Sequence, residues 1–178
     1  DKDLVRMLAN AGKFDEAQKL ALTLKSAKAT TGNLLVNGKF SSDPSFAPFD
    51  WELSTLGNLG ASIDKGNKQL VISAIGGVNG SAVRQLVRLE PGNYRLNWSM
   101  SNNTPLSENA ISARIVCGEP TGREALPFLT PLVAGKRYAN VKISEGTCRW
   151  HWLSIDVALP DDAMGVGIML SGLSLARA

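Results

Sequence analysis

The stretch that decides the fold is Asn33-Leu34-Leu35-Val36-Asn37-Gly38-Lys39-Phe40, which is followed after a short loop by Phe49-Asp50-Trp51. Before Asn33, apolar residues recur every three or four positions, as they do on one face of a helix. After Asn33, apolar and polar residues alternate, as they do in strands with one buried face. The periodicity changes at Asn33, so we expect helix before it and a β-domain after it.

The segments that follow Asn33 are short, and turn signals such as Lys65-Gly66-Asn67 separate them. Many short strands with regular turns are typical of a β-sandwich. The predicted strands are 34–40, 50–55, 60–64, 68–74, 81–89, 93–101, 110–117, 139–144, 149–158 and 165–177.

The segment from Val83 to Met100 is predicted to be a hairpin. Its turn, Glu90-Pro91-Gly92-Asn93, has Pro at the second and Gly at the third position, as type II turns do. Apolar residues alternate on both sides of the turn, so both sets must face the core. By the same alternation Trp98 is a core residue, and Trp51 is also expected to be structural.

Two motifs in this region resemble bacterial jelly-roll modules of the carbohydrate-binding, galactose-binding-like type. They are the opening Asn37-Gly38-Lys39-Phe40 and the run Gln85-Leu86-Val87-Arg88-Leu89-Glu90-Pro91-Gly92-Asn93-Tyr94-Arg95-Leu96, which is similar to a pattern "Q-x-V-x-L-x-P-G-x-Y-x-L". The resemblance implies a mainly β fold, a jelly-roll β-sandwich over residues 33–178. It also implies a non-catalytic module that binds carbohydrate, in an envelope or secreted bacterial protein linked to polysaccharide assembly or export.

Modules of this kind often hold a structural calcium with acidic residues just after the opening motif and in the last strand. Here the first position is Ser41, and the last strand reads Leu170-Ser171-Gly172-Leu173-Ser174-Leu175, without an acid. We therefore expect no metal and no other cofactor.

Residues 1–27 are predicted to be a short α-hairpin with a turn at Gly12-Lys13, and residues 28–32 a linker. The run from Leu8 to Ala17 resembles the middle of a tetratricopeptide repeat. One repeat cannot bury its own apolar face. Either further repeats precede Asp1 in a longer protein, which the absence of an initial Met suggests, or the hairpin packs on the next domain. The alternative function is a protein–protein adaptor that binds its partner through these helices.

Composition excludes several classes of protein. The net charge is +3 and the basic residues are scattered, whereas nucleic-acid surfaces normally show a basic stripe. We expect no nucleic-acid partner. No apolar run approaches the roughly 18 residues that a membrane-spanning helix needs.

The chain has two cysteines, Cys117 and Cys148. We expect a disulfide, and with it a periplasmic or extracellular location. Two buried thiols in a cytosolic protein remain the alternative. Alternation places the two cysteines on opposite faces of their strands, so either one strand has a bulge or the bond joins strand ends. The excursion 118–138 lies within the disulfide loop.

Catalytic residues are hard to find, and we expect no enzyme. His151 is the one histidine and shares its alternation with core residues. No Gly-x-Ser-x-Gly nucleophile elbow occurs. The acids on predicted strands, Glu52, Asp64 and Asp156, do not form an evident glycosidase pair.

The expected ligand-binding residues are aromatic and basic. Trp150 and Trp152 are two apart on one strand, so both point away from the core, where an exposed pair could stack on sugar rings. In the alternative, the helical hairpin or a long loop covers them. Arginines and amides with the outward alternation suit acidic sugars, although they also fit a solvated face. The expected set is Trp150, Trp152, Arg84, Arg88, Arg114 and Asn97.

Overall fold

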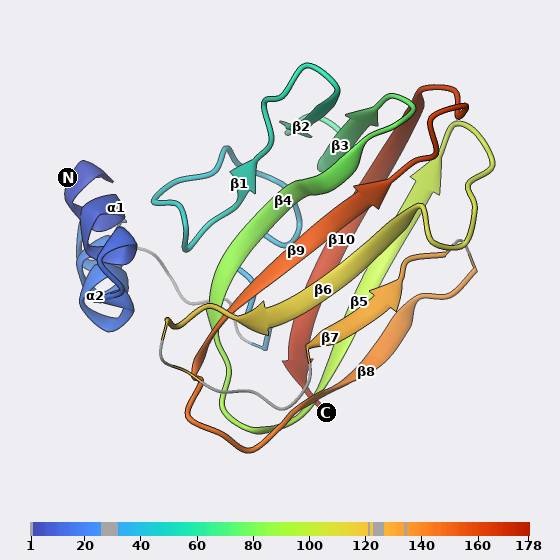
Figure 1. The fold of residues 1–178 in the computed structure, drawn as a ribbon. Helices are drawn as coiled ribbons and strands as arrows, with labels where there is room; N and C mark the ends of the chain where they lie inside the picture. The colour runs from blue at the N-terminus through green and yellow to red at the C-terminus, as the bar shows by residue number, and fades with distance from the viewer. Residues whose placement is uncertain (1, 26–31, 121, 123–126, 134) are drawn as a thin grey trace.

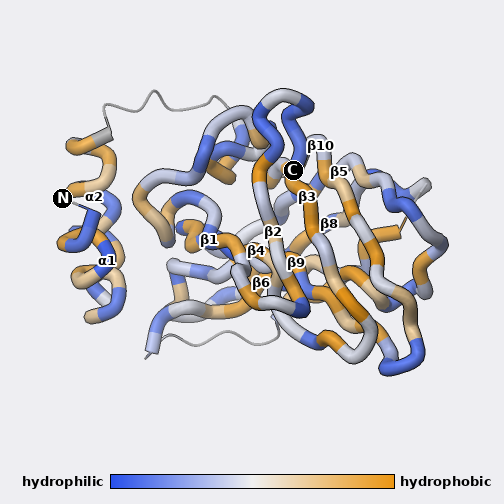
Figure 2. Tube along the Cα trace, turned by 90° about the horizontal axis from the view of Figure 1, so that it is seen from above, coloured by the Kyte–Doolittle hydropathy of each residue, from blue (hydrophilic) through white to orange (hydrophobic). Residues whose placement is uncertain are grey.

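The computed structural model describes residues 2–25, 32–120, 122, 127–133 and 135–178. These residues form two five-stranded antiparallel sheets, packed face to face, with two helices beside them (Figure 1). We call the two sheets A and B. Figure 2 shows that the helices lie beside sheet A, so that the layers are the helices, sheet A and sheet B. The predicted fold class, a mainly β jelly-roll sandwich with a short N-terminal α-hairpin, is confirmed.

Each sheet combines strands from distant parts of the sequence. Sheet A has the order β1 (Glu52–Leu53), β4 (Asn79–Arg88), β9 (Trp150–Ala158), β6 (Ile111–Cys117) and β7 (Phe128–Pro131). Sheet B has the order β2 (Leu59–Asp64), β3 (Gln69–Ala74), β10 (Val166–Arg177), β5 (Gly92–Asn102) and β8 (Tyr138–Ile143). β7 lies in the excursion 118–138 and is absent from the predicted strands, because four residues are too few to show a period.

The predicted strand 34–40 is wrong, because this segment consists of turns. Asn37 and Phe40 have φ angles of 56° and 52°, which a strand cannot accommodate. The backbone of Val36 is nevertheless hydrogen-bonded in the way that a neighbouring strand would bond it. The buried amide of Gln85 accepts a hydrogen bond from Val36 N (2.8 Å) and donates one to Val36 O (3.0 Å). A core-facing side chain therefore replaces a strand partner.

The hairpin predicted at Val83–Met100 is also wrong, because β4 lies in sheet A and β5 in sheet B. The connection crosses from one sheet to the other, and Gly92 has a φ of 153° rather than the roughly 80° of a type II turn. The apolar sets do meet in the core, as expected, but they meet across the sandwich. This change decides which faces the outward residues of the two strands occupy.

The core fills the space between the sheets. Trp98 and Trp51 are both buried within it, as predicted. The Trp51 ring lies 5.9 Å from that of Phe40, and its indole N–H donates to the Asn37 carbonyl (3.0 Å). The resemblance motif around residues 37–40 thus serves to close one end of the core.

The N-terminal hairpin consists of α1 (Lys2–Asn10) and α2 (Phe14–Lys25). Gly12 ends the first helix with a φ of 78°, and Lys13 N bonds back to Leu8 O (2.9 Å), which is the Schellman pattern. The two helices are confirmed, whereas their likeness to a tetratricopeptide repeat stays a prediction. Residues 28–31 of the predicted linker lie outside the described residues, and the division at 28–32 stays a prediction. Neither helix has the length and apolar character needed to cross a bilayer.

The hairpin packs on sheet A, as the second of the two expected alternatives requires. Its inward side contacts the outer face of β4 and β9 in a separate apolar cluster. The buried members of this cluster are Val5, Ala9, Phe14, Ala17, Ala21, Phe49, Leu86 and Trp150.

Tyr94 ties the crossing between the sheets to its own strand. Its side chain is buried, and its hydroxyl donates a hydrogen bond to the Glu90 carbonyl at 2.6 Å. The geometry resembles the tyrosine corner of other sandwiches, where a tyrosine bonds to the backbone a few residues upstream. Burial raises the pKa of Tyr94 above its ordinary value of 10.0, although Arg177 opposes the shift.

Tyr94→Phe should lower the free energy of unfolding by about 1 kcal/mol at neutral pH, because it removes this hydrogen bond. The Tyr94 hydroxyl ionises at a lower pH in the unfolded chain than in the folded protein. The stabilisation that Tyr94 contributes is therefore complete below pH 10 and decreases as the pH rises further. Urea denaturation of both proteins at pH 8 and above pH 10 checks this. The difference between them should narrow at the higher pH, and a constant difference would contradict the assignment.

Candidate functional site

Trp150 and Trp152 both point outward from sheet A, as the alternation predicts, but Trp150 is not available to a ligand. It is 2% exposed, because the hairpin and the loop before β1 cover it. Its ring lies 5.9 Å from Phe14 and 5.5 Å from Phe49, and its indole N–H donates to Asp15 Oδ1 at 3.1 Å. The prediction of an exposed sugar platform is therefore corrected: Trp150 is the contact on which the helices dock.

Trp152 is half-buried at the edge of the same cluster. The guanidinium of Arg84 lies 4.0 Å from the centre of its ring, which is a cation–π distance. Arg84 Nε is 2.7 Å from Glu52 Oε2, and Arg6 of the hairpin reaches Glu52 Oε1 at 3.5 Å. Arg84 thus already covers one face of the Trp152 ring, and Arg84 is itself paired with Glu52.

The other arginines of sheet A are also paired. Arg88 lies 2.7 Å from Asp15 of the hairpin and 3.3 Å from Glu90. Arg114 lies 2.9 Å from Asp156. Their positive charges are compensated at the surface, so this face does not offer the free arginine cluster that the sequence suggests.

Asn97 lies on the opposite side of the molecule from Arg84, Arg88 and Arg114. It is an outward residue of β5 in sheet B, whereas the arginines belong to β4 and β6 in sheet A. The predicted ligand set therefore does not form one site. The cause is the mistaken hairpin, since paired strands would have placed their outward residues on one face.

The outer face of sheet B instead gathers exposed residues from β5 and β8. Asn97 pairs with Tyr138 and Arg95 with Asn140, and all four side chains are exposed. Lys142 continues the row along β8. We call Arg95, Asn97, Tyr138, Asn140 and Lys142 the sheet B strip.

Tyr138 is the most informative member of the strip. Its ring is 48% exposed, and the Arg95 guanidinium lies 4.6 Å from the ring centre. Within the described residues, no carboxylate forms an ion pair with Arg95, in contrast to the arginines of sheet A. The strip therefore offers an aromatic ring, amides and uncompensated positive charge. The sequence signal for it is the strict outward alternation of Tyr138, Asn140 and Lys142.

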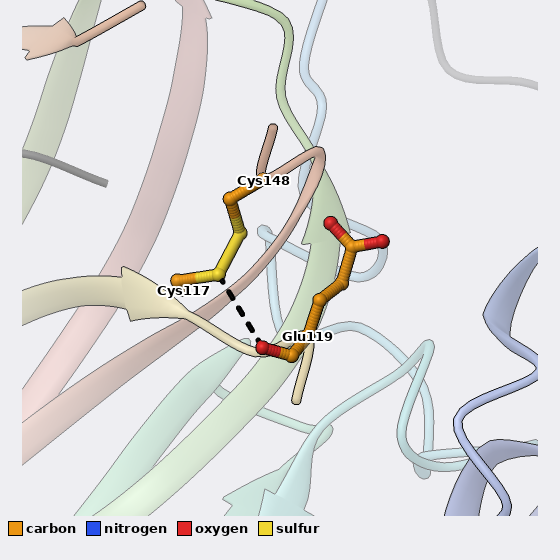
Figure 3. Close-up of side chains that lie close together, drawn as sticks. All are labelled: Cys117, Glu119 and Cys148. Carbon is orange, nitrogen blue, oxygen red and sulfur yellow. Dashed lines mark hydrogen bonds between the residues drawn. A yellow bond between two sulfur atoms is a disulfide. The ribbon is translucent and has the colours of Figure 1, made fainter. Parts of the chain in front are cut away.

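The two cysteines form a disulfide, as predicted. Cys117 is the last residue of β6 and Cys148 precedes β9, so the bond joins strand ends, which was one of the two expected solutions. Glu119 lies beside it (Figure 3), and its Oε2 accepts from Arg149 N (2.6 Å) and Trp150 N (3.2 Å). Together these groups bind the chain after β6 to the start of β9.

Cys117, Glu119 and Cys148 also bring three potential metal-ligating atoms within 4.8 Å of one another. The sulfurs are bonded to each other, and one carboxylate oxygen is already used by two backbone N–H groups. The arrangement as it stands is that of a structural clasp.

The residues weighed for catalysis are all engaged in structure. His151 is 1% exposed, on the core face of β9 as predicted. The acid Asp156 accepts from Ser81 (2.6 Å) and pairs with Arg114, and Glu52 pairs with Arg84. Hydrogen bonds from Asn67 lower the pKa of Asp64 and hold its carboxylate in the β2–β3 turn.

Comparisons with known proteins support the fold. No protein-family model matches the sequence, and no curated protein does. The active domain of tailspike protein 4 from bacteriophage CBA120 is similar with a TM-score of 0.54 and 16% identity, over 82% of this chain. This chain spans only 21% of the tailspike chain.

Solved structures of similar fold also include carbohydrate-binding modules. A CBM4 protein has a TM-score of 0.49 and 15% identity, over 72% of this chain and 94% of its own. TmCBM61, solved with β-1,4-galactotriose, has a TM-score of 0.47 and 15% identity, over 82% of this chain and 99% of its own. Both TM-scores lie below 0.5, so neither likeness supports an inference about this chain, and at 16% identity the likeness to the tailspike domain shows the fold alone.

Proposed function

We propose that this protein is a non-catalytic module that binds an acidic polysaccharide on the sheet B strip. The observation that carries the proposal is the exposed Tyr138 with Arg95 on its ring, an arginine that pairs with no carboxylate among the described residues. On this proposal, the apolar face of a pyranose stacks on the face of the Tyr138 ring opposite Arg95, as sugars do on other aromatic side chains. A guanidinium recognises a carboxylate in a forked geometry, so a uronic acid suits Arg95.

The rest of the strip fits the same ligand. Asn97 and Asn140 flank Tyr138 and present amide donors and acceptors to sugar hydroxyls. Lys142 extends the positive charge along the direction of β8, as an elongated anionic chain requires. The disulfide supports a periplasmic or extracellular location. On this proposal, the setting is an envelope or secreted bacterial protein that serves polysaccharide assembly or export.

Tyr138→Ala and Arg95→Gln should each weaken binding to polygalacturonate about tenfold, as measured by affinity electrophoresis, because each removes roughly 1–1.5 kcal/mol of stacking or charge-assisted bonding. Higher salt should weaken the wild type more than Arg95→Gln. Galactan, a neutral polymer, should retard the wild type and Arg95→Gln less than polygalacturonate does.

The matched control is Arg114→Gln, which removes an arginine of sheet A that is paired with Asp156. It should bind polygalacturonate like the wild type. If Arg114→Gln abolished binding while Arg95→Gln did not, the ligand would lie on sheet A and the proposal would be wrong.

A second candidate function, a protein–protein adaptor, is favoured by the outward side of the hairpin. There Leu4, Met7 and Leu22 are exposed, although the inward side of the same helices is packed. An apolar helix face of this kind is typical of protein contacts. Absence of retardation with every glycan would favour this function over the first. The variant Met7→Glu separates them further, because it alters the adaptor face and should leave glycan retardation unchanged.

A further inference from the structure

A hollow of about 390 Å³ lies at the far end of the sheet B outer face from Tyr138. It is bordered by the loop before β2, the end of β3, the start of β10 and the residue after β5. Asn103 of the hollow is six positions after Asn97 of the strip, a span of roughly 20 Å along an extended strand. Its volume is within the usual range of small-molecule sites, roughly 300–1,000 Å³.

The floor of the hollow consists of very small residues that lie side by side. Gly60 pairs with Ser73 on β3, and Ser73 pairs with Gly167 on β10. Asn103 closes the row, because its Oδ1 accepts from Gly167 N (2.9 Å) and its own N donates to Gly167 O (3.1 Å). A Cβ on Gly167 would come within 3.1 Å of the Asn103 amide nitrogen. The sheet surface is therefore open here because no side chain fills it.

The walls are apolar, although they face solvent. Leu56 is 65% exposed and Ile75 is 55% exposed, and both line the hollow. The Asn58 carbonyl accepts from Ile75 N at 3.2 Å, which holds the two wall segments together. Exposed branched aliphatic side chains beside amides and a hydroxyl indicate a ligand that has both methyl and hydroxyl groups.

Charge narrows the class of ligand. Among the described residues, those that line the hollow include no Asp, Glu, Lys or Arg. In contrast, a hollow of about 400 Å³ beside the hairpin is lined by Arg6 and Glu52, which are already paired with each other. A neutral ligand therefore suits the sheet B hollow, whereas the strip suits an anionic one.

We propose that this hollow binds a neutral sugar unit that carries a methyl group, either a 6-deoxyhexose or an N-acetyl sugar. The methyl group contacts Leu56 and Ile75, and the hydroxyls bond with Ser73, Asn58 and Asn103. The site is separate from the sheet B strip, and each can bind its ligand without the other.

Matched sugars test the proposal on the intact protein. L-Fucose has a methyl group where L-galactose has a hydroxymethyl group, and N-acetylglucosamine is compared with glucose. Titrations followed by nuclear magnetic resonance should show at least one methyl-bearing sugar binding about fourfold more tightly than its counterpart, as burial of one methyl group predicts. The shifted amide signals should be those of Gly60 and Gly167.

Ser73→Arg should abolish this binding by filling the hollow, and its exposed position on β3 leaves the core intact. The matched control is Ser62→Arg, an exposed residue of β2 outside the lining, which should bind like the wild type. Equal affinity for both members of each sugar pair, or equal loss in both variants, would overturn the proposal. Because Ser73→Arg should keep polygalacturonate binding and Tyr138→Ala should keep methyl-sugar binding, failure of either site is recognised separately.

Discussion

Replacing Cys117 and Cys148 with serine should lower the free energy of unfolding by about 3–4 kcal/mol, because it removes the disulfide. The bond joins residues 31 apart in sequence. In the chain-entropy model, opening a loop of this length increases the conformational entropy of the unfolded state, and this lowers the free energy of unfolding by about 3–4 kcal/mol. For a domain of this size, the melting temperature should fall by roughly 10 °C. Urea and thermal denaturation measure both quantities.

The reduced wild type is the natural control for this prediction. Its stability should match that of the double serine variant, and reductant should not change the variant. Equal stability of oxidised and reduced protein would show that the clasp of Glu119 with Arg149 N and Trp150 N suffices to hold these strand ends.

Trp150→Ala should lower the free energy of unfolding by about 3–5 kcal/mol, as loss of a buried aromatic side chain does. Trp150 is the centre of the cluster between the hairpin and sheet A, in contact with Phe14 and Phe49. The same change removes the hydrogen bond to Asp15. We therefore expect the helices to separate from the sandwich before the sandwich itself unfolds.

Hydrogen exchange separates these two effects. In Trp150→Ala, the exchange rates of backbone amides in α1 and α2 should rise much more than those of amides in β5 and β10. Trp152→Ala is the matched control, because Trp152 is half-buried and lies at the margin of the cluster. It should have a clearly smaller effect. Unchanged exchange in the helices of Trp150→Ala would mean that other contacts hold the hairpin.

Local pattern predicted most of the strands, because alternation is a property of each strand by itself. The outward direction of Trp150 and Trp152 and the core position of His151 follow from that alternation and are confirmed. Two local predictions failed for local reasons. Segment 34–40 has strand-like composition, but Asn37 and Phe40 adopt positive φ. β7 is too short to show a period.

The candidate site was much less predictable, because it depends on which strands share a sheet. The turn at residues 90–93 has the composition of a hairpin turn, yet it connects the two sheets. Arg84 and Asn97 consequently lie on opposite faces. No local pattern reveals that Glu52 and Asp15 approach the arginines of sheet A, since those partners are 32 and 73 residues away in sequence.

The sequence by itself determined that helix precedes Asn33 and that a β-domain follows it, the inward and outward residues of most strands, and the pair of cysteines. These follow from local geometry and from the count of thiols. Only the tertiary structure decided that the opening motif is held by Gln85, that the hairpin covers Trp150, and that Tyr138 and Arg95 form the open strip. The physical reason is that burial and charge compensation depend on contacts between distant segments, and the pairing of strands into sheets sets those contacts.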